Sequence, residues 1–276
     1  MRVRNDPPAP ANFLDAEIIR RRLRVMTLPI TNADRAVGAG VAGHIARHRI
    51  CGTDTPVCAS TPNQHRQECL CHKPVRLFFH GAAGQSFGAF CVEGMRLELD
   101  GVANDGVGKG MSGGEIVIRA NRLPDAVLAG NAILYGATGG RLFIAGRVGE
   151  RFAVRNSGAA AVVEGAGDHA CEYMTAGVVV ILGPTGVNAG AGMTGGTLFV
   201  AGEPSINAES VAALALTAPD ESLLRDLLVA HRFATGSERA RALLEDWPNS
   251  RLLFRRVVPI AAIPAEEEVI VRTTSC

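Results

Sequence analysis

A short phrase recurs four times between Gly110 and Gly202, and this repetition restricts the possible folds more than any other feature of the chain. Each copy is a turn of small residues followed by a short apolar strand, as in Gly110-Met-Ser-Gly-Gly-Glu-Ile-Val-Ile. The other copies begin at Gly136, Tyr173 and Gly192. Such repetition indicates a stack of similar units, each of which buries its apolar face against its neighbours.

The period of the repeat distinguishes between stacked folds. The second small residues of the successive turns are Gly94, Gly114, Gly140, Ala159, Gly177 and Gly196, in steps of 20, 26, 19, 18 and 19. We interpret the long step as a loop, Asn121-Arg-Leu-Pro-Asp-Ala, inserted into one coil. Steps of 18 to 20 predict an all-β solenoid, a parallel β-helix with one coil per repeat. A propeller blade is about twice as long, and a leucine-rich repeat needs a regular Leu and Asn pattern that this chain lacks.

The N-terminal third is expected to contain a tail, a helical lead-in and an insertion. Residues 1–12 are Pro-rich and polar, which is typical of a disordered tail. Residues 13–50 form the lead-in, with a helix from Asp15 to Arg24, an extended stretch at Val25–Ile30 and a helix from Thr31 to about His48. Many small residues between Ala36 and Gly43 indicate close packing of that second helix.

The β-helix itself is expected over residues 75–202, and residues 203–276 form a linker, a helical cap and a tail. We expect the linker to reach residue 220, followed by one helix from Asp220 to about His231 and another from Ser237 to Trp247, ended by Pro248. Residues from Leu252 are expected to be extended. A helical pair at the end of a solenoid would cover the exposed coil.

Residues 51–74 interrupt the pattern with four cysteines, Cys51, Cys58, Cys69 and Cys71, and with His65 and His72. Thiolate and imidazole are the usual ligands of zinc, so a zinc or iron–sulfur site is one hypothesis. The spacing Cys-x6-Cys-x10-Cys-x-Cys is not that of a standard zinc finger. A long surface loop with incidental thiols is the favoured interpretation, and a redox or cross-linking role for the last two cysteines is a lesser alternative.

Charge and hydropathy exclude several functional classes. The net charge of +1 offers no general electrostatic basis for binding nucleic acid or a membrane. No apolar run approaches the roughly 20 residues that a membrane helix needs. The N-terminal residues lack the apolar region of a secretory signal, so we expect a cytoplasmic protein. Seven cysteines, an odd number, argue against a disulfide framework.

Two segments invite a catalytic or nucleotide-binding interpretation. Gly106-Val-Gly-Lys-Gly resembles a phosphate loop, but Lys109 is followed by Gly110 and a strand rather than by Ser or Thr and a helix. The glycines are better explained as coil corners with positive φ. Asp168, His169, Cys171 and Glu172 offer an acid–base or nucleophilic set, although a buried thiol in a solenoid turn is the commoner situation.

Arg147, Glu150, Arg151 and Arg155 are dense charges for a β-coil. Strand-like alternation from Arg151 to Arg155 would place both arginines on the same side. These four residues form either a salt-bridge network within the chain or a surface for a partner. Turn residues Asn131, Asn156 and Asn188 are expected to cap or stack between coils.

Several long motifs resemble the C-terminal domain of the glutamate synthase large subunit. They include Gly81-Ala-Ala-Gly-Gln-Ser-Phe-Gly-Ala-Phe, Ala103-Asn-Asp-Gly-Val-Gly-Lys-Gly-Met-Ser and Gly146-Arg-Val-Gly-Glu-Arg-Phe-Ala-Val-Arg-Asn-Ser. The resemblance covers residues 14–50 and 75–258, and residues 51–74 look like an insertion. It implies a right-handed parallel β-helix that serves as a scaffold without catalytic residues.

The same resemblance implies partners that carry the chemistry. In that family a large subunit also has an amidotransferase domain with an N-terminal cysteine and a barrel with FMN and an iron–sulfur cluster. Here Met1 is followed by Arg2, and 276 residues cannot hold a barrel as well. We therefore expect a non-catalytic, free-standing subunit in a hetero-oligomer with amidotransferase-like and FMN-binding subunits, making glutamate or, as in N-methylglutamate synthase, N-methylglutamate.

Two alternatives remain at this point. The chain could be a β-helix scaffold of another metal-dependent oxidoreductase complex, similar to the small-subunit domains of formylmethanofuran dehydrogenase. It could also be a metal- or redox-binding protein that uses the four cysteines between Cys51 and Cys71. Neither alternative involves nucleic acid or a membrane.

Overall fold

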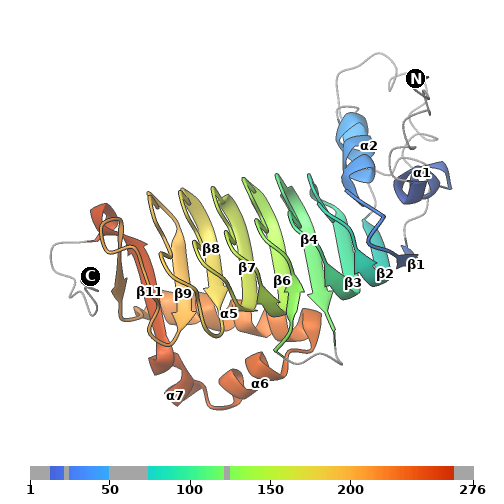
Figure 1. The fold of residues 1–276 in the computed structure, drawn as a ribbon. Helices are drawn as coiled ribbons and strands as arrows, with labels where there is room; N and C mark the ends of the chain where they lie inside the picture. Colours follow the sequence, from blue (N-terminus) through green and yellow to red (C-terminus); the bar gives the residue numbers. More distant parts are fainter. Residues whose placement is uncertain (1–12, 22–24, 50–73, 121–124, 264–276) are drawn as a thin grey trace, which may run out of the picture.

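The computed structural model describes residues 13–21, 25–49, 74–120 and 125–263, and its main body is a stack of strands along one axis (Figure 1). The strand order is β1-β2-β3-β4-β6-β7-β8-β9-β11-β10, with β5 beside β3 and β6. Pairs from β1 to β9 are parallel, whereas β11 is antiparallel to β9 and to β10. The parallel β-helix expected from the repeat is confirmed.

The strands are β1 (Val25–Ile30), β2 (Val75–Ala83), β3 (Met95–Ala103), β4 (Ser112–Arg119), β5 (Val127–Ala129), β6 (Gly139–Val148), β7 (Ser157–Gly165), β8 (Ala176–Ile181), β9 (Thr197–Ala201), β10 (Val211–Leu214) and β11 (Phe254–Pro259). The helices are α1 (Phe13–Arg20), α2 (Ala39–Arg49), α5 (Ala218–Thr235), α6 (Glu238–Glu245) and α7 (Trp247–Ser250), with 3₁₀ turns η2 (Arg251–Leu253) and η3 (Ile260–Ala262).

Side chains of similar character stack in register from coil to coil. The inward column runs through Leu77, Leu97, Ile116, Leu142, Ala161, Val179 and Leu198. All of these side chains are buried in the interior cluster. This column is therefore a continuous stack of aliphatic side chains, which is consistent with the low aromatic content of 5%.

The outward column changes character along the stack. From Glu98 in β3 it runs through Val117, Phe143, Val162, Val180 and Phe199. The apolar members form a second buried cluster with Leu224, Leu228 and Ala240 of α5 and α6. Strands β4 to β9 are thus buried on both faces, because the C-terminal helices cover the outer face.

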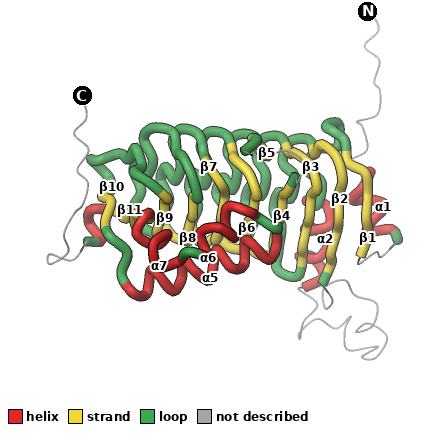
Figure 2. The backbone as a smooth tube through the Cα atoms, turned by 90° about the horizontal axis from the view of Figure 1, so that it is seen from below, coloured by secondary structure: helices red, strands yellow, loops and turns green. Residues whose placement is uncertain are grey.

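The C-terminal helices lie along the side of the β-helix and not across its end, which corrects the expected cap. Helix α5 packs against β4, β6 and β7, and Figure 2 shows α5 to α7 following the long axis. The expected linker contains β10, and it is the antiparallel β11 and β10 that complete the sheet beyond β9. Pro248 does not end the second helix, which stops at Glu245, but lies in the first turn of α7.

Helix α5 also begins earlier than expected. Thr217 is its N-cap, and Asp220 completes a capping box three residues later. Gly236 ends the helix in the left-handed conformation, with φ of 73°. Asp220, where the helix was expected to begin, therefore lies in its first turn, three residues after the N-cap.

The N-terminal end of the β-helix is closed by α1 and α2 (Figure 1). Asp15 does not cap α1; its carboxylate accepts hydrogen bonds from the N–H groups of Gly38 (2.8 Å) and Gly40 (2.7 Å) at the start of α2. Burial raises the pKa of Asp15, against the effect of these hydrogen bonds. A Cβ on Gly40 would lie 2.9 Å from the Asp15 carboxylate, so close packing explains this small residue.

Each coil also contains a five-residue turn whose first, third and fifth residues have positive φ. The members, coil by coil, are Ser86, Gly88, Phe90; Gly106, Gly108, Gly110; Ala132, Leu134, Gly136; Arg151, Ala153, Arg155; His169, Cys171, Tyr173; and Asn188, Gly190, Gly192. We call this column of turns the left-handed ladder. It runs the length of the β-helix.

Hydrogen bonds join each turn of the ladder to the coils on both sides. The N–H of Gly106 donates to Asn131 in the following coil, and that of Gly110 donates to Tyr135 there. The N–H of Gly108, between them, donates to Phe87 in the preceding coil. This alternation satisfies backbone groups that would otherwise be buried without partners. The glycines at coil corners, such as Gly114 and Gly140, also have positive φ, as expected.

His231 and Glu164 join α5 to β7. His231 is fully buried, and its Nε2 lies 3.8 Å from Oε1 of Glu164, beyond direct hydrogen-bond range. Burial lowers the pKa of His231, although the neighbouring carboxylate opposes this effect. Burial alone would raise the pKa of Glu164, but the Ser237 hydroxyl, His231 and Arg239 lower it overall. The neutral imidazole is therefore the form that the fold favours.

We expect Phe143→Ala to lower the free energy of unfolding by about 3–5 kcal/mol, because the ring is buried between β6 and α5. Urea denaturation measures the change. The matched control is Phe233→Ala, whose ring is 91% exposed on α5 and whose loss should cost less than about 0.5 kcal/mol. Equal losses in the two variants would contradict the assignment of Phe143 to this interface.

We expect stability to fall on mild acidification because of His231. Its pKa is lower in the folded chain than the ordinary 6.5, so the unfolded chain binds the proton first as the pH drops. The contribution of neutral His231 to the free energy of unfolding is therefore complete above about pH 6.5 and is lost as the pH falls below that value. Denaturation at a series of pH values from about 7.5 to 5.5 should show a shallower slope for His231→Phe than for the wild type. Parallel curves would contradict the prediction.

Candidate functional site

The predicted metal ligands Cys51, Cys58, Cys69 and Cys71 lie outside the described residues, so the metal-site hypothesis stays a prediction. Cys91 and Cys171 are free and buried. Burial raises the pKa of Cys91 to about 12 and that of Cys171 further still. Neither thiol is therefore activated as a nucleophile at neutral pH. Within the described ranges, no three His, Cys, Asp or Glu side chains are grouped to hold a metal ion.

The residues around Cys171 serve separate structural roles. The Asp168 carboxylate accepts a hydrogen bond from the Val187 N–H (2.8 Å) in the next coil. The Nδ1 of His169 lies 3.0 Å from the Glu172 carboxylate and 3.2 Å from the Asn188 amide. Cys171 points into the buried interior cluster, away from these polar groups. The structure does not assemble a nucleophile with a base here.

The apparent phosphate loop is one turn of the left-handed ladder. Gly106, Gly108 and Gly110 have positive φ, and β4 follows them rather than a helix. The Lys109 ammonium lies 5.7 Å from the centroid of the Tyr135 ring, which is the distance of a cation–π contact. The glycines therefore shape the backbone, as expected from the sequence.

The turn asparagines cap and stack between coils, as predicted. Asn156 is fully buried, and its side chain bonds both the N–H (2.9 Å) and the carbonyl (3.0 Å) of Ala159. The Asn131 side chain accepts a hydrogen bond from the Glu150 N–H of the next coil (2.8 Å). Asn188 accepts one from the Asn207 amide (2.8 Å).

Arg147, Glu150, Arg151 and Arg155 are all exposed. Within the described part of the chain none of the four forms an ion pair, so the internal salt-bridge network is not present. Arg151 and Arg155 do share a side, but the expected strand is wrong: their backbone is a turn of the left-handed ladder, with φ of 58° and 55°. These charges remain available on the surface.

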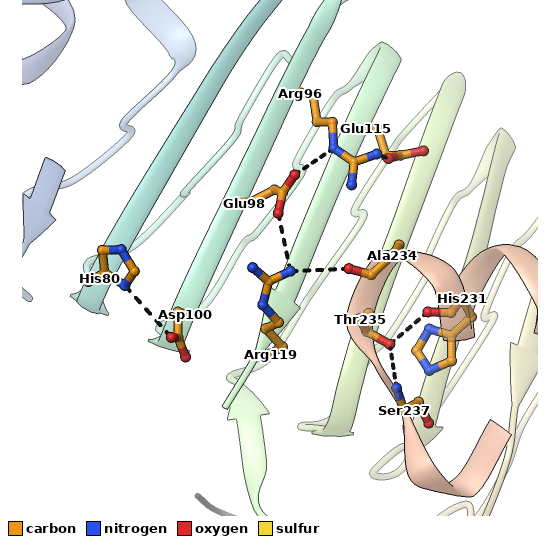
Figure 3. Close-up of polar contacts among 10 residues, drawn as sticks. All are labelled: His80, Arg96, Glu98, Asp100, Glu115, Arg119, His231, Ala234, Thr235 and Ser237. Atoms are coloured by element: carbon orange, nitrogen blue, oxygen red, sulfur yellow. Dashed lines mark hydrogen bonds and ion pairs between the residues drawn. The ribbon is translucent and has the colours of Figure 1, made fainter. Parts of the chain in front are cut away.

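A second charged cluster lies on the outer face of β3 and β4, beside the C-terminal end of α5 (Figure 3). Arg96 bonds the carboxylates of Glu98 (2.7 Å) and Glu115, and Arg119 bonds Glu98 (3.2 Å) and the carbonyl of Ala234 (3.2 Å). The sequence signal for it was the alternation Arg96-Leu-Glu98-Leu on a strand. These charges pair with one another and tie the end of α5 to the sheet.

A cavity of about 910 Å³ lies where the turn between α5 and α6 meets the sheet. Arg119, Glu164 and Arg239 line it, together with Phe233 at its rim. The guanidinium of Arg239 already bonds the carbonyls of Glu164 (3.1 Å) and Leu182 (3.2 Å). The polar groups of this cavity hold the helices in place and offer no set of groups for catalysis.

The described residues thus present a stack of coils with two kinds of surface. One kind is covered by helices or internally paired charges, and the other carries the unpaired arginines of the ladder. None of the helices in the described ranges is long and apolar enough to span a bilayer. The arrangement is suited to binding a macromolecule across an extended face.

Comparison with known proteins identifies the family of this chain. The family described as the GXGXG motif matches residues 13–260. The chain is 46% identical over 253 residues to ferredoxin-dependent glutamate synthase 2 of Synechocystis sp. and 44% identical over 253 residues to the chloroplastic ferredoxin-dependent glutamate synthase of Spinacia oleracea. It is 43% identical over 246 residues to the NADH glutamate synthase of Schizosaccharomyces pombe.

The matches cover most of this chain and a small part of each relative. They include 88%, 88% and 85% of the chain, but only 15%, 14% and 11% of the three relatives. The three glycines at alternate positions of Gly106–Gly110 are the pattern that the family's description names. With its coils, its ladder and this similarity over nearly its whole described length, the chain belongs to the GXGXG motif family and is related to glutamate synthases.

Proposed function

We propose that this chain is a structural, non-catalytic subunit of a glutamate synthase-type enzyme. It holds amidotransferase-like and FMN-binding subunits in register, so that an amino group or methylamine enters glutamate chemistry on the flavin-bearing partner. Glutamate and N-methylglutamate are the two candidate products. The enzyme is a hetero-oligomer whose flavin and iron–sulfur cofactors reside on the partners.

The observation that carries the proposal is similarity of about 45% to one region of glutamate synthases, of which the chain spans about one seventh. The proposal assigns the functions of the relatives' remaining length to partner subunits. A further support is the use of the described polar groups: the carboxylates, imidazoles and amides near the coil turns hold neighbouring coils together. A rigid stack of coils suits a scaffold, because its backbone hydrogen bonds run continuously from one end to the other.

We expect the tagged chain, isolated from its native host, to bring down an FMN-containing protein and an amidotransferase-like protein in fixed ratio. Mass spectrometry identifies the partners, and flavin absorbance verifies the cofactor. When the partners are produced without this chain, they should not co-elute. Recovery of the chain alone, or joint elution of the partners in its absence, would contradict the scaffold role.

We expect His169→Gln to leave the turnover of the assembled enzyme within about twofold of wild type, because a scaffold residue contributes no transition-state stabilisation. Steady-state rates with glutamine or methylamine as the amine source provide the measurement, and the preferred amine identifies the product. A loss of about a hundredfold or more, the size typical of a lost acid–base group, would instead place chemistry on this chain.

A further inference from the structure

Three aromatic side chains are exposed along the left-handed ladder. Phe90 and Tyr173 are each 57% exposed, and Tyr135 is 38% exposed. Phe90 and Tyr173 occupy the fifth position of their turns, and Tyr135 occupies the fourth. Arg155 occupies the fifth position in the coil between those of Tyr135 and Tyr173. We call the side chains of Phe90, Lys109, Tyr135, Arg155 and Tyr173 the ladder surface.

The fifth position is one at which the backbone favours glycine. Phe90, Arg155 and Tyr173 have φ of 59°, 55° and 52°, a region that side chains other than glycine adopt at a cost. The other three coils carry Gly110, Gly136 and Gly192 there, all with φ of 64°. Large side chains in this conformation are accounted for in general by packing or by function.

Packing does not account for these three side chains. Arg155 is exposed and forms no ion pair with any described residue. The aromatic rings rest against the glycine of the next coil, since a Cβ on Gly110 would lie 2.9 Å from the Phe90 ring and one on Gly192 would lie 2.5 Å from the Tyr173 ring. Both residues nevertheless remain 57% exposed.

The middle of the ladder surface is open at Gly136. Gly136 would meet nothing within 4 Å if it carried a Cβ, unlike Gly110 and Gly192. Tyr135 precedes it, and Arg155 lies in the following coil, whose Val154 carbonyl accepts the Gly136 N–H (3.0 Å). Aromatic and arginine side chains around an open space have the composition of binding hot spots.

The ladder surface is separate from the faces already occupied. The side chains that pack against α5 and α6 come from the strands and not from the ladder. Lys109 of this surface lies over the Tyr135 ring, and Arg151, at the first position of the turn that ends at Arg155, forms no ion pair with any described residue. The unpaired charges favour a partner that presents carboxylates.

We propose that the ladder surface is the docking site for a protein partner with an acidic face, namely the polypeptide that completes the glutamate synthase-type enzyme. The inference rests on the proposed function for the identity of that partner. The side chains at Phe90, Arg155 and Tyr173 are retained against the backbone preference for glycine because they bind this partner. A carboxylate side chain of the partner reaches Arg155, and an apolar side chain of the partner lies over Gly136.

Replacement by glycine separates binding from folding. Tyr173→Gly, Phe90→Gly and Arg155→Gly relieve the backbone at positions where neighbouring coils already carry glycine. We expect their thermal unfolding midpoints to equal or exceed that of wild type, while affinity for the purified partner falls about tenfold or more. Tyr173→Asn, whose side chain tolerates positive φ without the added freedom of glycine, should behave in the same way.

Two further measurements serve as controls: the dependence of affinity on salt, and the affinity of variants with substitutions outside the ladder surface. Arg155→Gly should weaken the dependence of affinity on salt, because it removes a charge that pairs across the interface. Arg232→Ala and Phe233→Ala replace an exposed arginine and an exposed aromatic on α5 and should bind as wild type does. Calorimetric titration of the chain with its partner measures all of these affinities.

Several results would overturn the inference. Wild-type affinity in the glycine variants would show that the ladder surface is not the docking site, even though the scaffold role still stands. A fall of about 5 °C or more in their unfolding midpoints would assign the side chains to the fold instead. A wild-type chain that dimerises through this surface, with dimers lost in Tyr173→Gly, would identify a second copy as the occupant. Failure of the wild-type chain to bind any flavin-bearing or amidotransferase-like partner would remove the proposed function and this inference together.

Discussion

The hydrogen bonds between adjacent coils are the interaction on which the rest of the structure depends. Strands of a parallel β-helix have no partners within their own coil, so each coil is stable only beside the next. The left-handed ladder extends this pairing to the turns, with N–H groups that point alternately forwards and backwards along the axis. Positions such as Leu134 and Ala153 hold positive φ at a cost of about 1–2 kcal/mol each, and the bonds on both sides hold them there.

The architecture of the β-helix could be predicted from the sequence because a repeat depends on local geometry. The step of 18 to 20 residues and the corner glycines Gly114, Gly140, Gly177 and Gly196 follow from the need for each coil to return to the same register. The structure of the ladder could not be predicted in this way. In four of the six coils, most of the ladder residues with positive φ are not glycine. Their conformation depends on contacts with neighbouring coils, and a local sequence pattern does not show those contacts.

The positions of the helices were harder to predict than their existence. Strands with three consecutive apolar residues, such as Ile116-Val-Ile and Leu142-Phe-Ile, contribute their middle residue to the cluster under the helices, whereas Leu97-Glu-Leu places a charged side chain at that position. This contrast, present in the sequence, indicates where α5 and α6 lie. The surface charges Arg147, Glu150, Arg151 and Arg155 could be selected from the sequence as partner candidates, but the exposed rings of Phe90 and Tyr173 could not, because an aromatic side chain is ordinarily assigned to the core.

The antiparallel pairing of β11 with β9 and β10 gives the stack a defined length. A parallel β-helix can in principle add coils without limit, since every new coil offers the same edge as the last. Here the antiparallel β11 lies between β9 and the edge strand β10, so the run of parallel coils ends at β9, and α1 and α2 close the opposite end. Because the coils stack on one another, equivalent positions on the ladder are separated by a whole number of strand spacings, each about 4.8 Å. The loss or gain of one coil would change the distance between sites on either side of that coil by one such spacing.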